Sequence, residues 1–128
     1  MYKNIDFSVL KGKTLVSVED CQIGSDRVTF RTTDGKSYSL FHSQDCCESV
    51  SINDIDGDFN DLIGEPLLVA EENSSLDGFV DTVKHYDSYT WSFYRLATQK
   101  GWVVIRWLGE SNGYYSESVD FVENTIWP

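Results

Sequence analysis

Short runs in which apolar and polar residues alternate recur along the chain, and no segment keeps a helical apolar period for three turns. Such alternation predicts β-strands with one buried face. The clearest pair is 27–32 and 37–41, in which Val, Phe, Tyr and Leu alternate with Arg, Thr and Ser. Asp34 and Gly35 between them supply the positive-φ position of a tight turn. These residues predict a β-hairpin.

The C-terminal third predicts a second group of strands. Residues 88–98, 102–108 and 114–122 are rich in aromatic and β-branched residues and are separated by Gln-Lys-Gly and Asn-Gly turns. This pattern predicts three consecutive antiparallel strands. Shorter strands are predicted at 13–18 and 66–70.

Helix signals are confined to one place. Residues 58–64 combine an acidic first turn with a Gly stop, which predicts one or two helical turns. The polar stretch 71–78 predicts an exposed loop. The fold class expected is mainly β, an antiparallel sheet or sandwich with short helical insertions, in a single domain that spans residues 1–128.

Composition supports a folded but strongly acidic chain. The 128 residues are 41% hydrophobic and 14% aromatic, and 21 Asp and Glu against 10 Lys and Arg give a net charge of -11. Residues 51–87 carry ten acidic groups and one basic group. Without a basic cluster the chain is not expected to bind nucleic acid directly. It contains no apolar run of the ~20 residues that a spanning helix needs and no signal-peptide run, so we expect no membrane association.

The strongest chemical motif follows the predicted hairpin. His42, Cys46 and Cys47 lie within six residues and are ligand types that zinc prefers. They predict one structural zinc whose fourth ligand comes from elsewhere, His85 being the first choice. Cys21 and Asp45 are the alternatives.

Three other states of these cysteines are open. They could be ordinary reduced thiols, or they could form a vicinal disulfide, which closes a strained eight-membered ring. A Cys nucleophile with His42 as its base is a third possibility. The carboxylates of Asp45 and Glu48 disfavour it, because neighbouring negative charge raises a thiol pKa.

A second motif is acidic. From Asp54 the chain places carboxylates at positions 1, 3, 5 and 12 of a calcium-type loop, but Phe59 occupies the position that needs Gly. A solvated acidic turn, with Asp58 capping the short helix, is favoured over calcium. Its carboxylates are also the candidate partner-binding residues: Asp54, Asp56, Asp58, Asp61 and Glu65.

Aromatic residues crowd the segment 102–117. We expect most of them to pack across neighbouring strands. Any that are exposed could form a surface for a partner or for a homodimer.

Two blocks carry a family resemblance: His42-Ser-Gln-Asp-Cys-Cys-Glu-Ser-Val and Gly109-Glu-Ser-Asn-Gly-Tyr-Tyr-Ser-Glu-Ser-Val-Asp. With these the chain resembles a family of small uncharacterised proteins encoded by bacteriophages and prophages, over roughly residues 10–121. The resemblance implies a phage context and a cytoplasmic location in the infected bacterial cell. It implies no mechanism. Small acidic phage proteins include inhibitors of host defence, anti-CRISPR proteins among them.

The leading functional hypothesis is a non-catalytic, phage-encoded inhibitor that binds a host defence protein, with a CRISPR nuclease as the first target class. An acidic face can occupy the basic groove of a nucleic-acid-processing protein in place of phosphates. The alternative is a small metal-dependent enzyme or a ligand-sequestering protein that uses His42, Cys46 and Cys47.

Overall fold

The hairpin predicted from the alternating pattern is present. Strands β2 (Arg27–Thr32) and β3 (Ser37–Phe41) pair in antiparallel fashion. Gly35 in the connecting turn has a φ of 86°, the left-handed conformation that glycine adopts without strain. The prediction is confirmed here because the turn chemistry and the alternation both favour the same register.

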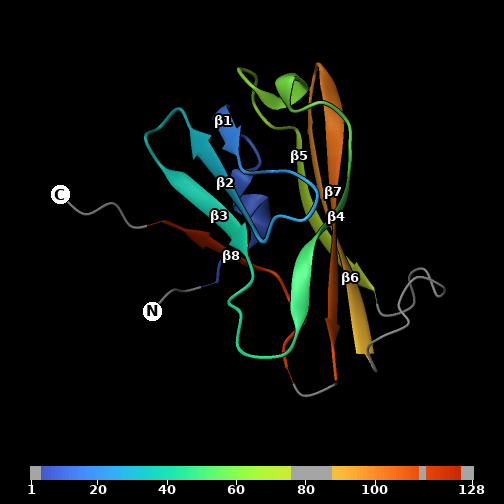
Figure 1. The fold of residues 1–128 in the computed structure, drawn as a ribbon. Helices are drawn as coiled ribbons and strands as arrows, with labels where there is room; N and C mark the ends of the chain where they lie inside the picture. Colours follow the sequence, from blue (N-terminus) through green and yellow to red (C-terminus); the bar gives the residue numbers. More distant parts are fainter. Residues whose placement is uncertain (1–3, 76–87, 113–114, 125–128) are drawn as a thin grey trace.

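The computed structural model describes residues 4–75, 88–112 and 115–124 and contains two four-stranded antiparallel sheets (Figure 1). The first sheet has the order β1-β2-β3-β8 and the second the order β4-β7-β6-β5. The bounds of the remaining strands are Leu15–Glu19 (β1), Ser49–Asp56 (β4), Val69–Ser75 (β5), Ser88–Thr98 (β6), Gly101–Ser111 (β7) and Asp120–Glu123 (β8). The mainly β fold class expected from the sequence is therefore confirmed.

The core lies between the two sheets and is completed by a short 3₁₀ helix, η1 (Phe7–Leu10), which lies between them in Figure 1. The ring of Phe7 contacts Phe30 and Phe121 of the first sheet and Tyr94 of the second, at centroid distances of 6.2, 5.0 and 4.9 Å. Edge-to-face aromatic pairs of this kind stabilise a core beyond the area they bury. η1 therefore joins the two layers through one side chain.

Three predictions about strands were wrong. β4 was not predicted, because its register shifts between Ile52 and Asp54 and the alternation breaks there. Residues 71–75, predicted as a loop, belong to β5, whose polar side chains lie on an edge strand. The third strand expected at 114–122 is the short β8, which pairs with β3 in the other sheet rather than with β7.

The predicted helical turn is the 3₁₀ helix η2 (Phe59–Leu62). Asp58 is its N-cap and accepts a hydrogen bond from the backbone amide of Asn60 at 2.9 Å. The acidic turn capped by Asp58 is thus confirmed. Within the described ranges no helix is long and apolar enough to cross a lipid bilayer.

Candidate functional site

Residues 42–48 form the connection by which the chain passes from β3 in the first sheet to β4 in the second. His42 and Glu48 are buried at its two ends, with side chains 3% and 0% exposed. The His42 Nε2 and Glu48 Oε2 atoms are 2.8 Å apart. A buried carboxylate needs hydrogen-bond donors, so the loop between the two residues has to supply them to Glu48.

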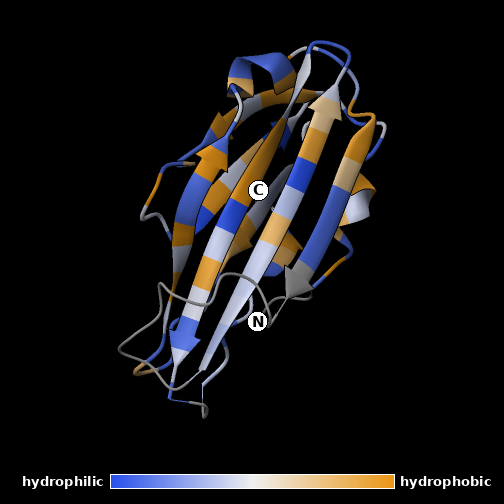
Figure 2. Cartoon of the chain, turned by 90° about the vertical axis from the view of Figure 1, so that its right-hand side faces the viewer, coloured by the Kyte–Doolittle hydropathy of each residue, from blue (hydrophilic) through white to orange (hydrophobic). Residues whose placement is uncertain are grey.

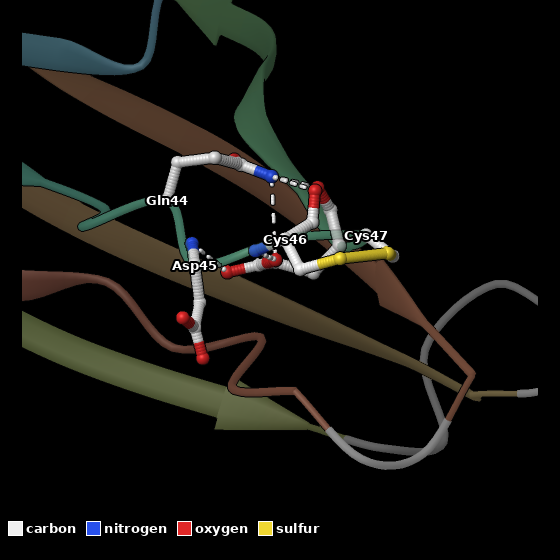
Figure 3. The surroundings of a disulfide bond; sticks show 5 residues. Gln44, Asp45, Cys46 and Cys47 are labelled. Atoms are coloured by element: carbon white, nitrogen blue, oxygen red, sulfur yellow. Dashed lines mark hydrogen bonds between the residues drawn. A yellow bond between two sulfur atoms is a disulfide. The ribbon is translucent and has the colours of Figure 1, made fainter.

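The loop between the pair folds around the Glu48 carboxylate. The backbone amide of Asp45 donates to Oε2 at 2.8 Å, and that of Cys46 donates to Oε1 at 2.9 Å. The Gln44 side-chain amide donates to Oε1 as well, at 3.2 Å, and also to the Glu48 backbone carbonyl. Figure 3 shows this loop with the Gln44 amide reaching across it. Four donors, counting His42, therefore surround one carboxylate.

The donors lower the pKa of Glu48. Burial raises this pKa, but hydrogen bonds from the Cys46 amide, the His42 ring and the Asp45 amide together outweigh burial and lower it from 4.5 to about 2. Glu48 is therefore ionised at neutral pH, although its side chain is shielded from solvent.

The second nitrogen of His42 is also occupied. Nδ1 lies 2.8 Å from the backbone carbonyl oxygen of Ser118, which can only accept. Nε2 faces the ionised Glu48 carboxylate, which also accepts. Both ring nitrogens are therefore engaged in hydrogen bonds within the fold.

The two cysteines are bonded to each other. A disulfide joins Cys46 to Cys47, and both residues are exposed at the outer side of the loop (Figure 3). Of the cysteine states left open by the sequence, the structure has the vicinal disulfide. A disulfide sulfur is neither a thiolate ligand nor a nucleophile.

Three of the zinc ligands proposed from the sequence are thus engaged within the fold: His42 in hydrogen bonds, and Cys46 and Cys47 in the disulfide. His85 lies outside the described residues. Cys21 is partly buried against the core, and burial raises the pKa of its thiol to about 12, which disfavours the thiolate that zinc needs. The backbone amide of Asp45 donates to Glu48, and Asp45 itself is exposed. In the parts of the chain that the structure describes, no group of three or more His, Cys, Asp or Glu could hold a metal ion.

The His42–Ser118 hydrogen bond joins the two sequence blocks that carry the family resemblance. In the second block, a Cβ atom on Gly109 would overlap the backbone of Glu117, so only glycine allows this close approach. The Glu117 carboxylate accepts from the hydroxyls of Thr90 and Ser111. These contacts fix the segment that presents the Ser118 carbonyl to His42. Sequence reasoning missed Glu48 and Ser118 as partners of His42.

The candidate partner-binding carboxylates fall into two groups. Asp54 and Asp56 are exposed on the outer face of the second sheet. Asp58, Asp61 and Glu65 lie in and beside η2, after the end of β4. Asp58 is committed to capping, and the Asp61 carboxylate lies against Gly101. Of the five residues, Asp54 and Asp56 line the outer face of the second sheet.

The outer face of the second sheet holds an open groove of about 820 Å³, which we call the outer groove. It crosses all four strands, from Asp54 and Asp56 on β4 to Glu71 on β5. Figure 2 views this sheet from outside, with hydrophobic and hydrophilic positions mixed along each strand. Trp102 on the groove is 58% exposed. Trp107, five residues later on the same strand, is fully buried in the core.

The aromatic segment is thus divided between the two faces of one strand. Alternation predicts that residues two apart share a face, so the even positions of β7 face out while the odd ones face the core. The core packing expected for these aromatics is therefore confirmed for Trp107, and Trp102 is an exposed residue to which the partner-surface interpretation applies.

Comparison with known proteins gives a family but no activity. Neither the curated proteins nor the solved structures contain a match to the chain. One family model, described as a domain of unknown function (DUF7448), matches residues 8–121, which include both sequence blocks and all the strands except the last two residues of β8. The chain therefore belongs to this family of unknown function.

Proposed function

We propose that the protein is a phage-encoded inhibitor that binds a host defence protein without catalysis, with a CRISPR nuclease as the first target class. The observation that carries this proposal is the charge: the chain has a net charge of -11. Ten of its acidic residues lie between 51 and 87. Nucleic-acid-processing proteins present basic grooves, to which an acidic surface is steered and in which it competes with phosphates.

The arrangement of the buried loop supports a binding role over the enzyme alternative. Catalysis by His42 needs a free ring nitrogen, and thiol chemistry needs a thiolate. Here both nitrogens are engaged in hydrogen bonds within the fold and the two sulfurs are bonded together. The same contacts explain these residues as a structural link between the sheets.

The test is inhibition of DNA cleavage by a panel of purified CRISPR nucleases, with binding measured at low and moderate salt. The expected result is inhibition of at least one nuclease, with binding that weakens by about tenfold or more as salt rises, because the attraction is electrostatic. The double variant Asp54→Asn/Asp56→Asn should bind more weakly.

The matched control is Asp20→Asn/Asp26→Asn, which removes the same charge from exposed residues beside the first sheet. This control should bind as the wild type does. A wild-type protein that inhibits no nuclease in the panel, or a control that weakens binding as much as the test variant, contradicts the proposal.

A further inference from the structure

The outer groove has a layout that follows directly from strand register. Residues paired across neighbouring strands form rows, and rows two residues apart along a strand face the same side of the sheet. Three consecutive rows line the groove. Each places side chains of different chemistry across the sheet.

The first row is apolar. Trp102 on β7 pairs with Ala97 on β6, and Ala97 pairs with Val69 on β5. Trp102 is 58% exposed, although an indole buries more apolar area than any other side chain when it is covered. Large, rigid aromatic side chains in such positions are typical anchors of protein interfaces.

The middle row has acidic ends, with one apolar residue and one arginine between them. Val104 on β7 lies between Asp56 on β4 and Arg95 on β6, and Arg95 pairs with Glu71 on β5. With strands ~4.8 Å apart, the two carboxylates at the ends are separated by about 14 Å. Arg95 can only donate hydrogen bonds, so it suits a backbone carbonyl of a ligand.

In the third row the charged groups are already in contact. Arg106 donates to the Asn53 side-chain oxygen at 3.1 and 2.8 Å, lies 3.8 Å from Asp54 and stacks over the Trp91 ring at 5.1 Å. Phe93, its cross-strand partner, adds a half-buried aromatic ring. The groove as a whole has three carboxylates and two guanidinium groups, and the sheet itself holds one of the guanidinium groups.

We propose that the outer groove binds an extended protein segment in which one large apolar side chain lies between two cationic side chains. The separation of about 14 Å corresponds to about four residues of extended chain at ~3.4 Å each. Residues at i, i+2 and i+4 of such a segment point to the same side. The groove therefore selects the pattern cationic-x-apolar-x-cationic, running across the strands from Asp56 over Val104 and Arg95 to Glu71. The Arg95 guanidinium then donates to a backbone carbonyl of the segment.

This inference rests on the proposed function, because it assumes that the chain acts by binding a protein. It adds the surface and the chemistry of the partner. The probe is a displayed library of random 12-residue peptides, selected on the wild-type protein and then compared on variants. Enriched peptides should contain Lys or Arg at i and i+4 with an apolar residue between them.

Trp102→Ala should weaken the selected peptides by about tenfold or more, as expected for an aromatic anchor. Val104→Ser provides a second groove variant if the first is poorly folded. The matched control is Ile23→Ala, because Ile23 is 66% exposed and lies outside the second sheet. It should bind the peptides as the wild type does.

Peptides without the cationic pair, or peptides that bind Trp102→Ala as tightly as the wild type, overturn the inference. So does a wild-type dimer that Trp102→Ala converts to a monomer, since the groove would then hold a second copy of the chain. The proposed function fails separately, when the wild type inhibits no nuclease. If the wild type inhibits a nuclease and Trp102→Ala inhibits it equally well, the proposed function stands and only the proposal about the outer groove fails.

Discussion

The loop at residues 42–48 and the outer groove both contain residues of the kinds that often carry function, but His42 and Glu48 of the loop are buried, and Trp102 and the carboxylates of the groove are exposed. In the loop, the His42 and Glu48 side chains are almost fully buried and every polar contact stays within the protein. In the groove, Trp102 and the carboxylates of Asp54 and Asp56 are exposed. Buried polar groups that are satisfied internally specify a fold, whereas exposed aromatic and charged groups are available to a partner.

The cluster at residues 42–48 has a structural role that its residue types alone do not suggest. A cluster of His, Cys and Glu suggests chemistry because these side chains bind metals and transfer protons. Here the same cluster holds a crossover between two sheets, and its hydrogen bonds extend to Ser118 in the second sequence block. The residues that define the family resemblance therefore have a structural explanation.

The largest expected effect is the loss of Glu48. Replacing Glu48 by Ala leaves the His42 ring and the amides of Asp45 and Cys46 without their acceptor. Leaving several buried donors without an acceptor is strongly destabilising, so the thermal midpoint should fall by on the order of 10 °C. The control is Glu71→Ala, at an exposed position, which should leave the midpoint nearly unchanged. Equal midpoints for the two variants would show that the loop is not structural.

Acid should unfold the protein through the same residue. The pKa of Glu48 is about 2 in the folded state and near 4.5 when it is exposed, so its contribution is fully present above pH 4.5. That contribution disappears as the pH falls from 4.5 towards 2, because the unfolded state then binds the proton first. Unfolding by urea, measured between pH 2 and 6, should give a steeper loss of stability for the wild type than for Glu48→Gln. Parallel profiles would contradict the low pKa.

The disulfide should affect stability less. Cys46 and Cys47 are adjacent, so the closed loop is as short as possible and the chain-entropy model gives at most about 1 kcal/mol. A dithiol that reduces the bond transfers two electrons and two protons to the sulfurs and should lower the thermal midpoint by only a few degrees. Iodoacetamide should modify both exposed cysteines after reduction and neither before it.

The zinc predicted from the sequence can be tested in the same samples. Reduction frees the two sulfurs, and native mass spectrometry with added zinc then shows whether His42 leaves Glu48 to bind the metal. We expect the reduced protein to keep its metal-free mass, since Glu48 holds both His42 and the loop amides. If the reduced protein binds one zinc tightly and Cys46→Ser/Cys47→Ser abolishes this binding, the predicted zinc site exists in the reduced protein.

The smallest effect on stability is expected in the groove. Trp102 is 58% exposed, so Trp102→Ala should change the free energy of unfolding by about 0.5 kcal/mol or less. Chemical denaturation measures this directly. A loss comparable with that of Glu48→Ala would mean that Trp102 supports the fold, and would remove the contrast between the two regions.

Local pattern was enough to predict the parts of the fold that depend on neighbours in sequence. The β2–β3 hairpin follows from alternation and an Asp-Gly turn, and the cap of η2 follows from Asp58. β4 was missed because the register shift after Ile52 breaks its alternation and its exposed face is acidic. The place of β8 beside β3 depends on a long-range pairing that no local pattern specifies.

The candidate sites were predicted only in part, because local sequence pattern does not specify long-range contacts. The sequence brings His42 close to Cys46 and Glu48 along the chain, but it does not show that loop amides turn towards the Glu48 carboxylate or that Ser118 arrives from 76 residues away. The outer groove depends on the register of four strands, including one that was not predicted. Of its lining, Asp54, Asp56 and the aromatic segment that begins at Trp102 were identified beforehand.

The outer groove is proposed as the functional surface, whereas the contacts of the loop at residues 42–48 have a structural explanation. The most direct test measures the affinity of one selected cationic-apolar-cationic peptide for the wild type, Trp102→Ala and Cys46→Ser/Cys47→Ser by fluorescence anisotropy. We predict a loss of about tenfold or more for Trp102→Ala and an affinity within about twofold of the wild type for the cysteine variant. The reverse order, with the cysteine variant weakened and Trp102→Ala unchanged, would contradict the account.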